Sequence, residues 1–226
     1  MKKHLQTAFS SRQYMISKDI ELYYYDDANL SGVKTHNHNY YEFYFFLQGD
    51  ISMVIDKREH SLTPGDIVFI PPSVYHHTLN HTTSCPYRRF VFWVSKEYFQ
   101  HLIELSPDYE YILTHASTKQ QYVYHKDIIS FNSIQADLFH LLEEIHTARF
   151  GHSTKLYLCV NNLLINLNRM AYEQNHSKKS KRGLSLYENI LAYIEAHLEE
   201  ELSLDQLAEA FYVNKYHIAH IFKENL

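Results

Sequence analysis

The chain has 226 residues, of which 45% are hydrophobic and 15% aromatic, and its formal net charge is −5. This length allows one large or two small domains with a real core. No apolar run approaches the roughly 20 residues of a membrane span, which excludes a membrane protein, and the acidic balance argues against a nonspecific nucleic-acid binder. The first ten residues lack the apolar centre of a secretory signal. Cys85 and Cys159 form no motif, which favours a reduced cytoplasmic protein.

The first zone, about 18–125, is rich in short β-type runs. They cover 20–25, 40–47, 66–70, 74–79, 87–94 and 122–124, and Ile51, Met53 and Ile55 alternate with other residues in a further strand. Gly49-Asp50, Pro64-Gly65 and Pro71-Pro72 supply turns between them. Short strands without long intervening helices predict a sandwich or barrel. Ser95 is the expected N-cap of a short helix that ends at Leu105.

A helical zone follows at 126–174. Apolar residues recur at three-and-four spacing in two stripes, Phe131 to Ile145 and Leu156 to Ala171, joined at Gly151. This pattern predicts a helical hairpin. The stripes either cover the barrel of their own subunit or form a subunit interface, and we expect dimerisation through this hairpin. Residues 175–183 are a predicted basic linker, either solvated or in contact with phosphate.

The last zone, 184–226, shows the spacing of a helix-turn-helix. An apolar stripe at Tyr187, Ile190, Leu191, Ile194 and Leu198 opens it. Ser203 is the expected cap of a short helix at 204–211, and Asn214 caps the next one. Two short helices about three residues apart, with the small Ala208 at their crossing, are typical of this motif.

One constellation in the first zone carries potential chemistry. His36, His38, Glu42 and Gly49 precede a second group with Gly65, Pro71, His76 and Asn80. This order resembles both motifs of the cupin superfamily, a double-stranded β-helix barrel, with Ser73 where the family pattern has a glycine. The resemblance implies that in a metal-binding member His36, His38, Glu42 and His76 would ligate one divalent transition metal. Residues 36 and 38, two apart on one expected strand, would point the same way, and residue 42 shares their parity.

Three interpretations of these residues remain open: a metal centre, a contact set for an organic ligand, or a polar packing cluster. Sensor versions of the cupin fold commonly lack metal. We therefore expect no cofactor and favour no metal. The predicted effector-binding residues are His36, His38, Glu42, Tyr44 and His76.

A second resemblance covers the C-terminal run. Residues 202–209, followed by Val213 to Tyr216, Ile218 and Ile221 to Lys223, look like the first helix-turn-helix of AraC/XylS-type transcriptional regulators. A cupin-like sensor ahead of the reader is that family's usual order. By position, the resemblance implies that the DNA-binding residues are Asn214, Lys215, Tyr216, His217, Ala219, His220 and Lys223. Tyr216 and His220 would donate hydrogen bonds to bases, and Ala219 would contact a thymine methyl.

The chain departs from this family in one respect. The family's DNA-binding unit has two helix-turn-helix motifs, whereas this sequence stops at Asn225-Leu226 after the first. Eight acidic residues against two lysines after Leu184 would also neutralise phosphate poorly. We expect either a fragment of a longer regulator or a naturally short chain.

The leading hypothesis is thus a cytoplasmic, ligand-responsive, homodimeric transcriptional regulator of the AraC type and not an enzyme. Residues 1–125 would bind a small-molecule effector, for which polar cavity walls suit a sugar, and residues 184–226 would read double-stranded operator DNA. The alternatives are a cupin metalloenzyme and a truncated dimerising modulator without autonomous DNA binding.

Overall fold

The computed structural model describes residue 7 and residues 13–27, 33–82, 85–126, 128–176, 186–197, 202–211 and 213–225. The chain divides into two compact units, Met1–His176 and Ser177–Leu226. In the described residues, no helix has the length and apolar character needed to cross a bilayer.

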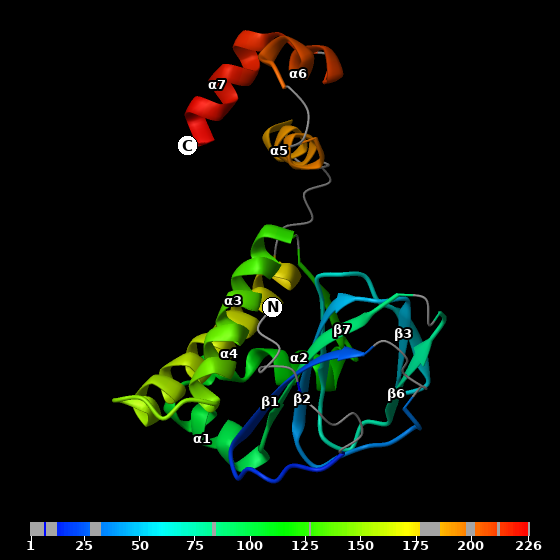
Figure 1. Ribbon diagram of the computed structural model, residues 1–226, viewed down its shortest axis with the longest axis vertical. Helices are drawn as coiled ribbons and strands as arrows, with labels where there is room; N and C mark the ends of the chain where they lie inside the picture. The colour runs from blue at the N-terminus through cyan, green and yellow to red at the C-terminus, as the bar shows by residue number, and fades with distance from the viewer. Residues whose placement is uncertain are drawn as a thin grey trace. The chain divides into compact units, whose positions relative to one another are not determined.

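The first unit is built on two antiparallel sheets (Figure 1). The larger has the order β1-β7-β2-β5-β8 and the smaller β4-β3-β6. The strands are β1 (Ile20–Asp27), β2 (Tyr41–Gln48), β3 (Ile51–Ile55), β4 (Arg58–Ser61), β5 (Asp66–Ile70), β6 (His76–Asn80), β7 (Tyr87–Val94) and β8 (Val123–His125). The expected sandwich or barrel is therefore present, with β4 as a strand that the sequence did not predict.

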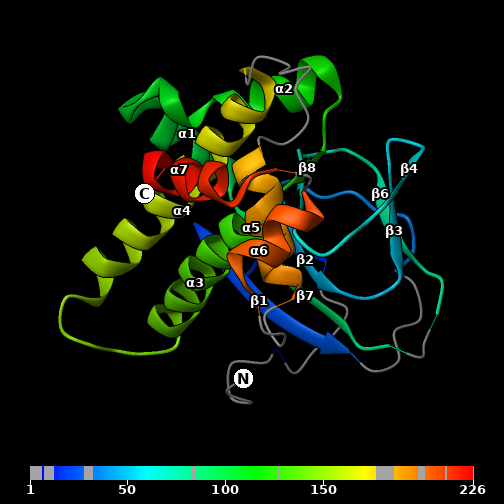
Figure 2. The ribbon, with the colours of Figure 1, turned by 90° about the horizontal axis from the view of Figure 1, so that it is seen from above.

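Helices cover one face of the larger sheet, and the smaller sheet lies over the other face (Figures 1 and 2). The helices are α1 (Lys96–Leu105), a 3-10 helix (Pro107–Tyr109), α2 (Tyr111–Lys119), α3 (Ile128–Ile145) and α4 (His152–His176). Ser95 caps α1 by accepting a hydrogen bond from the Tyr98 amide, as predicted. Helix α2 was not predicted, because its single apolar stripe is short and contains His115.

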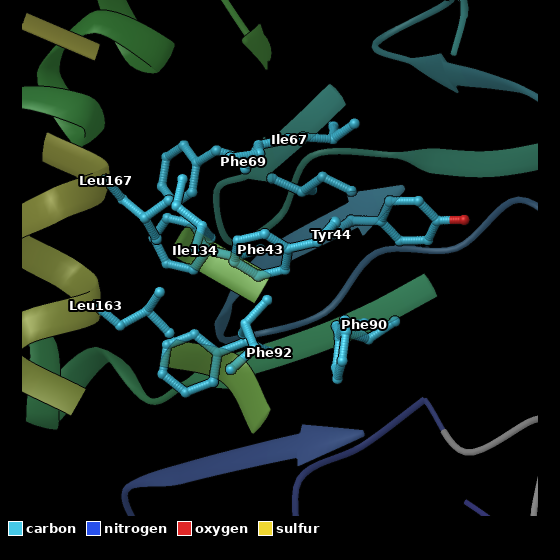
Figure 3. Close-up of a cluster of buried hydrophobic side chains, with 14 of the residues drawn as sticks. Phe43, Tyr44, Ile67, Phe69, Phe90, Phe92, Ile134, Leu163 and Leu167 are labelled. Atoms are coloured by element: carbon cyan, nitrogen blue, oxygen red, sulfur yellow. The ribbon is translucent and has the colours of Figure 1, made fainter. Parts of the chain in front are cut away.

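The central strand β2 is buried on both of its faces. Figure 3 shows Phe43 with Phe69 and Phe92 on the side of Leu163 and Leu167 of α4, while Tyr44 points the opposite way. Alternate side chains of a strand project to opposite faces of the sheet, so β2 contributes to two cores at once. Phe43, Phe45 and Phe46 are each fully buried as a result.

The helical hairpin predicted at 126–174 is formed by α3 and α4, and Gly151 adopts a left-handed conformation (φ 73°) just before α4. The expected linker boundary was wrong, because Asn175 and His176 still belong to α4. The basic linker residues Lys178, Lys179, Lys181 and Arg182 lie outside the described residues.

The second unit contains α5 (Leu186–Ala196), α6 (Leu204–Ala210) and α7 (Lys215–Asn225). One buried residue from each helix forms its core: Ile190, Leu207 and Ile218. Ser203 and Gln206 form a capping box at the start of α6. The Asn214 side chain accepts a 2.8 Å hydrogen bond from the Tyr216 amide at the start of α7, as expected of a cap.

Candidate functional site

The first unit has a partly open cavity of about 80 Å³ between its two sheets. Strands β1, β2 and β7 supply one wall, and β3 and β6 supply the other. Its lining comprises Gln13, Tyr25, Val33, His36, Glu42, Tyr44, Met53, His76, His77, Thr78, Tyr87, Arg89, Val91 and Trp93. Four of the five predicted effector-binding residues are therefore in the wall, and the fifth, His38, is buried beside Glu42.

His38, Glu42 and His76 form a compact cluster at one end of this cavity. All three are buried, and one potential ligand atom from each lies within 4.8 Å of the others. The closest approach is 3.4 Å between His38 Nε2 and Glu42 Oε2. Glu42 projects from β2, and His76 is the first residue of β6, so the cluster joins the two sheets.

Backbone carbonyl groups orient the imidazole rings. Nδ1 of His38 lies 2.8 Å from the Tyr40 carbonyl oxygen, and Nδ1 of His76 lies 3.0 Å from that of Val74. A carbonyl oxygen can only accept, so each Nδ1 carries the proton and a neutral ring keeps a lone pair on Nε2. Both Nε2 atoms are buried and have no hydrogen-bond partner.

The pKa values of Glu42 and His76 are both lower than usual. Burial raises the pKa of Glu42, but the close imidazole of His38, the imidazole of His76 and the hydrogen bond from Trp93 outweigh it and bring that pKa to about 2. Burial lowers the pKa of His76 to about 4, against the opposing attraction of Glu42. At neutral pH the cluster thus contains a buried carboxylate beside a neutral imidazole.

His36 departs from the sequence prediction. It is not on a strand with His38; its backbone makes only an isolated bridge to His76. Its half-buried ring lies 4.2 Å from the ring of His76 but 6.2 Å from that of His38. The strand begins only at Tyr41, so the period-two rule does not apply to residues 36 and 38. His36 lines the cavity without joining the compact cluster.

The donor chemistry of the cluster fits a divalent transition metal. A lone pair on His38 Nε2 faces a carboxylate oxygen at 3.4 Å, and His76 Nε2 is unpartnered in the same space. These lone pairs repel unless a proton or a cation lies between them. Two imidazoles, each oriented by a backbone carbonyl group, and one carboxylate are a common metal-ligand set. His38, Glu42 and His76 are the residues that would hold such an ion.

The other end of the cavity contains a buried cation that the sequence reading missed. Arg89 is 5% exposed, and its Nη1 donates a 2.7 Å hydrogen bond to Asp27 Oδ2. Its guanidinium lies over the rings of Tyr25 and Tyr87, and the Tyr87 and Tyr44 hydroxyls are hydrogen-bonded to each other. Residues 89, 91 and 93 are spaced by two on one strand, so Arg89 faces the same side as Val91 and Trp93. This spacing was the signal in the sequence that could have identified Arg89 as a cavity residue.

The seven predicted DNA-binding residues are all exposed. They cap or lie on α7, opposite the buried Ile218, and Tyr216 is 76% exposed. Lys215 Nζ forms a 2.9 Å ion pair with Asp205 Oδ1 of α6. Exposure is compatible with contact to DNA, and DNA binding itself stays a prediction.

Residues 29–93 match a family model described as Cupin domain. No curated protein matches the sequence. Among solved structures, the chain is similar to an RmlC-like cupin family protein with a double-stranded β-helix fold from Methanocaldococcus jannaschii. The identity is 16% and the TM-score 0.32, over 35% of this chain and 72% of that chain.

Two enzymes are also among the similar structures. Salicylate 1,2-dioxygenase from Pseudoaminobacter salicylatoxidans is 16% identical with a TM-score of 0.32, over 40% of this chain and 24% of that chain. DMSP lyase DddQ from Ruegeria pomeroyi DSS-3 is 26% identical with a TM-score of 0.31, over 35% of this chain and 40% of that chain. The match at residues 29–93 supports a cupin-like domain in the first unit, and several helices follow it in the chain, as predicted.

Proposed function

We propose that the chain is a ligand-responsive, DNA-binding transcriptional regulator of the AraC type rather than an enzyme. In this proposal a small-molecule effector binds in the cavity of the cupin domain, and α7 reads an operator. The observation that supports it most is the geometry of α6 and α7, which holds one face of α7 inward and leaves the opposite face exposed.

The anchoring of α7 is local and well defined. Ile218 is fully buried against Leu207 of α6 and Ile190 of α5. The turn between α6 and α7 is held by a 3.0 Å hydrogen bond from the Val213 amide to the Ala208 carbonyl. A helix held in this way can present its N-terminal residues to base edges in a major groove. Tyr216, Ala219 and His220 are the exposed residues that we assign to base contacts.

Phosphate contacts by this unit would be weak. Lys215 and Lys223 are its only lysines after Leu184, and Lys215 is already paired with Asp205. Since each neutralised phosphate contributes to the salt dependence of DNA binding, we expect residues 184–226 to contribute only a shallow salt slope. Specificity would then depend on base contacts and on the pairing of two chains.

Pairing of chains is assigned to the helical hairpin. Its exposed apolar side chains include Phe150 in the loop and Tyr157 and Leu158 on α4, which are 107%, 42% and 57% exposed. These side chains would be covered in a homodimer, which would place two α7 helices on two operator half-sites. Effector binding changes DNA affinity only if the effector prefers one arrangement of the chain over another.

The cluster of His38, Glu42 and His76 is compatible with this role. A divalent ion held by these three residues would supply a Lewis-acidic centre in the cavity. The surrounding residues orient these three side chains: Trp93 holds the Glu42 carboxylate, and the carbonyl groups of Tyr40 and Val74 hold the imidazoles. We assign no catalytic step to them.

Selection from a random duplex DNA library tests the proposal. The complete product of the gene that encodes this chain is immobilised, and bound duplexes are amplified and sequenced. We expect a recurrent motif, lost in the variants Tyr216→Ala and His220→Ala and retained in Glu195→Ala, an exposed position on α5. Absence of any enriched motif, or a motif insensitive to both α7 variants, would overturn the proposal.

A further inference from the structure

The two ends of the cavity offer opposite hydrogen-bonding chemistry. At one end, Arg89 is a permanent cation with five N–H groups, and one nitrogen is engaged by Asp27. The rings of Tyr25 and Tyr87 lie 4.4 Å and 4.1 Å from its central carbon, so the remaining donors lie at the edge of the guanidinium plane. Because Arg89 is buried, its remaining N–H donors at this edge can bind an oxygen acceptor of a ligand.

Two phenols extend the donor character of this end. Tyr44 and Tyr87 are phenols in the cavity wall, and a phenol carries its hydroxyl proton at neutral pH. The two hydroxyls share one hydrogen bond, which uses one proton and leaves the other available to a ligand. Arg89, Tyr44 and Tyr87 together form what we term the donor corner.

The opposite end offers acceptors. The Nε2 atom of His76 is buried, unpartnered and aprotic, since Nδ1 carries the proton. Beside it lies the buried carboxylate of Glu42, which also lines the cavity. Both groups favour a ligand that brings a hydroxyl proton.

Between the ends, Val91 of β7 and Met53 of β3 supply apolar lining, and Thr78, the register partner of Met53, adds one hydroxyl. Arg89 and Trp93, which mark the two ends on β7, are four residues apart, or about 13 Å along a strand, and their side chains reduce the span. The volume of about 80 Å³ is small beside the several hundred Å³ of drug-sized pockets. A compact, linear molecule fits this shape better than a ring with hydroxyls on all sides.

We infer that the cavity of the metal-free protein takes a short-chain hydroxycarboxylate, with its carboxylate at the donor corner and its hydroxyl at His76 and Glu42. The role of this molecule as an effector rests on the proposed function. Its binding in the cavity does not depend on DNA. Polar walls alone would suit a sugar, which was the effector expected from the sequence. The cavity instead favours a molecule with one anionic end and an apolar middle.

Isothermal titration calorimetry of chelator-treated protein with three matched probes tests the inference: 4-hydroxybutanoate, butanoate and 1,4-butanediol. The diol keeps the hydroxyl and lacks the charge, and butanoate keeps the charge and lacks the hydroxyl. We expect 4-hydroxybutanoate to bind at least tenfold more tightly than either. Hydroxycarboxylates with three and five carbons, titrated in the same way, determine which chain length fits the cavity. Equal affinities for the acid and the diol, or no binding of any homologue, would overturn the inference.

A matched pair of arginine variants locates the carboxylate. Arg89→Met should abolish the preference for the acid over the diol. Arg88→Met, at an adjacent, 41% exposed side chain paired with Asp26 at 3.1 Å, should leave it unchanged. If Arg89→Met does not fold, Tyr44→Phe and Tyr87→Phe serve instead, with Tyr41→Phe as the control outside the cavity. An acid preference that survives removal of every donor would refute the inference. The DNA selection is a separate readout, so either proposal can fail alone.

Discussion

Trp93 and Glu42 are register partners on the neighbouring strands β7 and β2, and the indole Nε1 of Trp93 donates a 2.7 Å hydrogen bond to Glu42 Oε2. Glu42 is 6% exposed, so this bond replaces much of the water that the carboxylate loses on folding. The ring of Trp93 is itself held by Tyr23 and Tyr40, at centroid distances of 5.2 Å and 4.8 Å. The carboxylate is thereby fixed beside the imidazoles.

Trp93→Phe removes this donor and keeps an aromatic side chain. We expect the free energy of unfolding to fall by about 2 kcal/mol, because a hydrogen bond to a buried charge is lost. Urea denaturation measures the change. In a Glu42→Gln background the same substitution should cost clearly less, and equal costs in both backgrounds would show that the loss comes from packing alone.

Acid should destabilise the metal-free first unit through His76. Its pKa is about 4 in the folded protein, against an ordinary value of 6.5, so the unfolded chain binds the proton first. The contribution is fully present above pH 6.5 and is lost as the pH falls toward 4, by about 3 kcal/mol in total. Denaturation in chelator at several pH values measures it. His76→Gln should flatten this slope, and His81→Gln, at a 45% exposed side chain, should not.

Divalent metal should bind at His38, Glu42 and His76. Chelator-treated protein titrated with Co²⁺ is expected to take up one ion per chain, seen as visible ligand-field absorption. At 100 times the dissociation constant, the ion should raise stability by about 2.7 kcal/mol. His38→Ala and His76→Ala should each abolish uptake, and His36→Ala should only weaken it. Uptake that persists in both of the first two variants would place the ion elsewhere.

Ser73→Gly should stabilise the first unit. Ser73 has φ 68°, a left-handed conformation, and its amide donates a 2.8 Å hydrogen bond to the His38 carbonyl oxygen. Glycine adopts this conformation without the penalty of about 1 kcal/mol that a side chain incurs. Thermal and urea unfolding should show a gain of up to that size after the entropy of the unfolded glycine is subtracted. Ser73→Ala, which keeps the strain, is the control and should show no gain.

The regular strands could be predicted because their runs of apolar and aromatic residues end at turn residues. The limits of β5 and β7 agree with the predicted runs, and the turn at Gly65 is real, with φ 99°. The caps at Ser95, Ser203 and Asn214 were also predictable, since a side-chain oxygen before a helix has one obvious partner. These signals are local, which is why one sequence suffices to find them.

The cavity could be predicted only in part, because it depends on contacts between distant residues. Glu42 and His76 were found from their motif, but Trp93 and Arg89 lie 51 and 62 residues from the carboxylates that they contact. The alternation in β3 predicts an exposed Ser52, but this side chain is buried, and its Oγ lies 2.8 Å from His81 Nε2. Such pairings follow from sheet order, which periodicity does not specify.

The two-sided burial of β2 also limits how this segment can change in length. Glu42 and Tyr44 face the cavity, whereas Phe43 faces α4. Insertion or deletion of a single residue within the strand would exchange the two sets, with aromatic carbon in the cavity and a carboxylate against the helices. Substitutions at these positions can be absorbed one at a time, but a one-residue change in length alters both cores together. Length variants of this strand should therefore occur in steps of two residues or be taken up by a bulge, such as the register shift seen between Phe46 and Gln48.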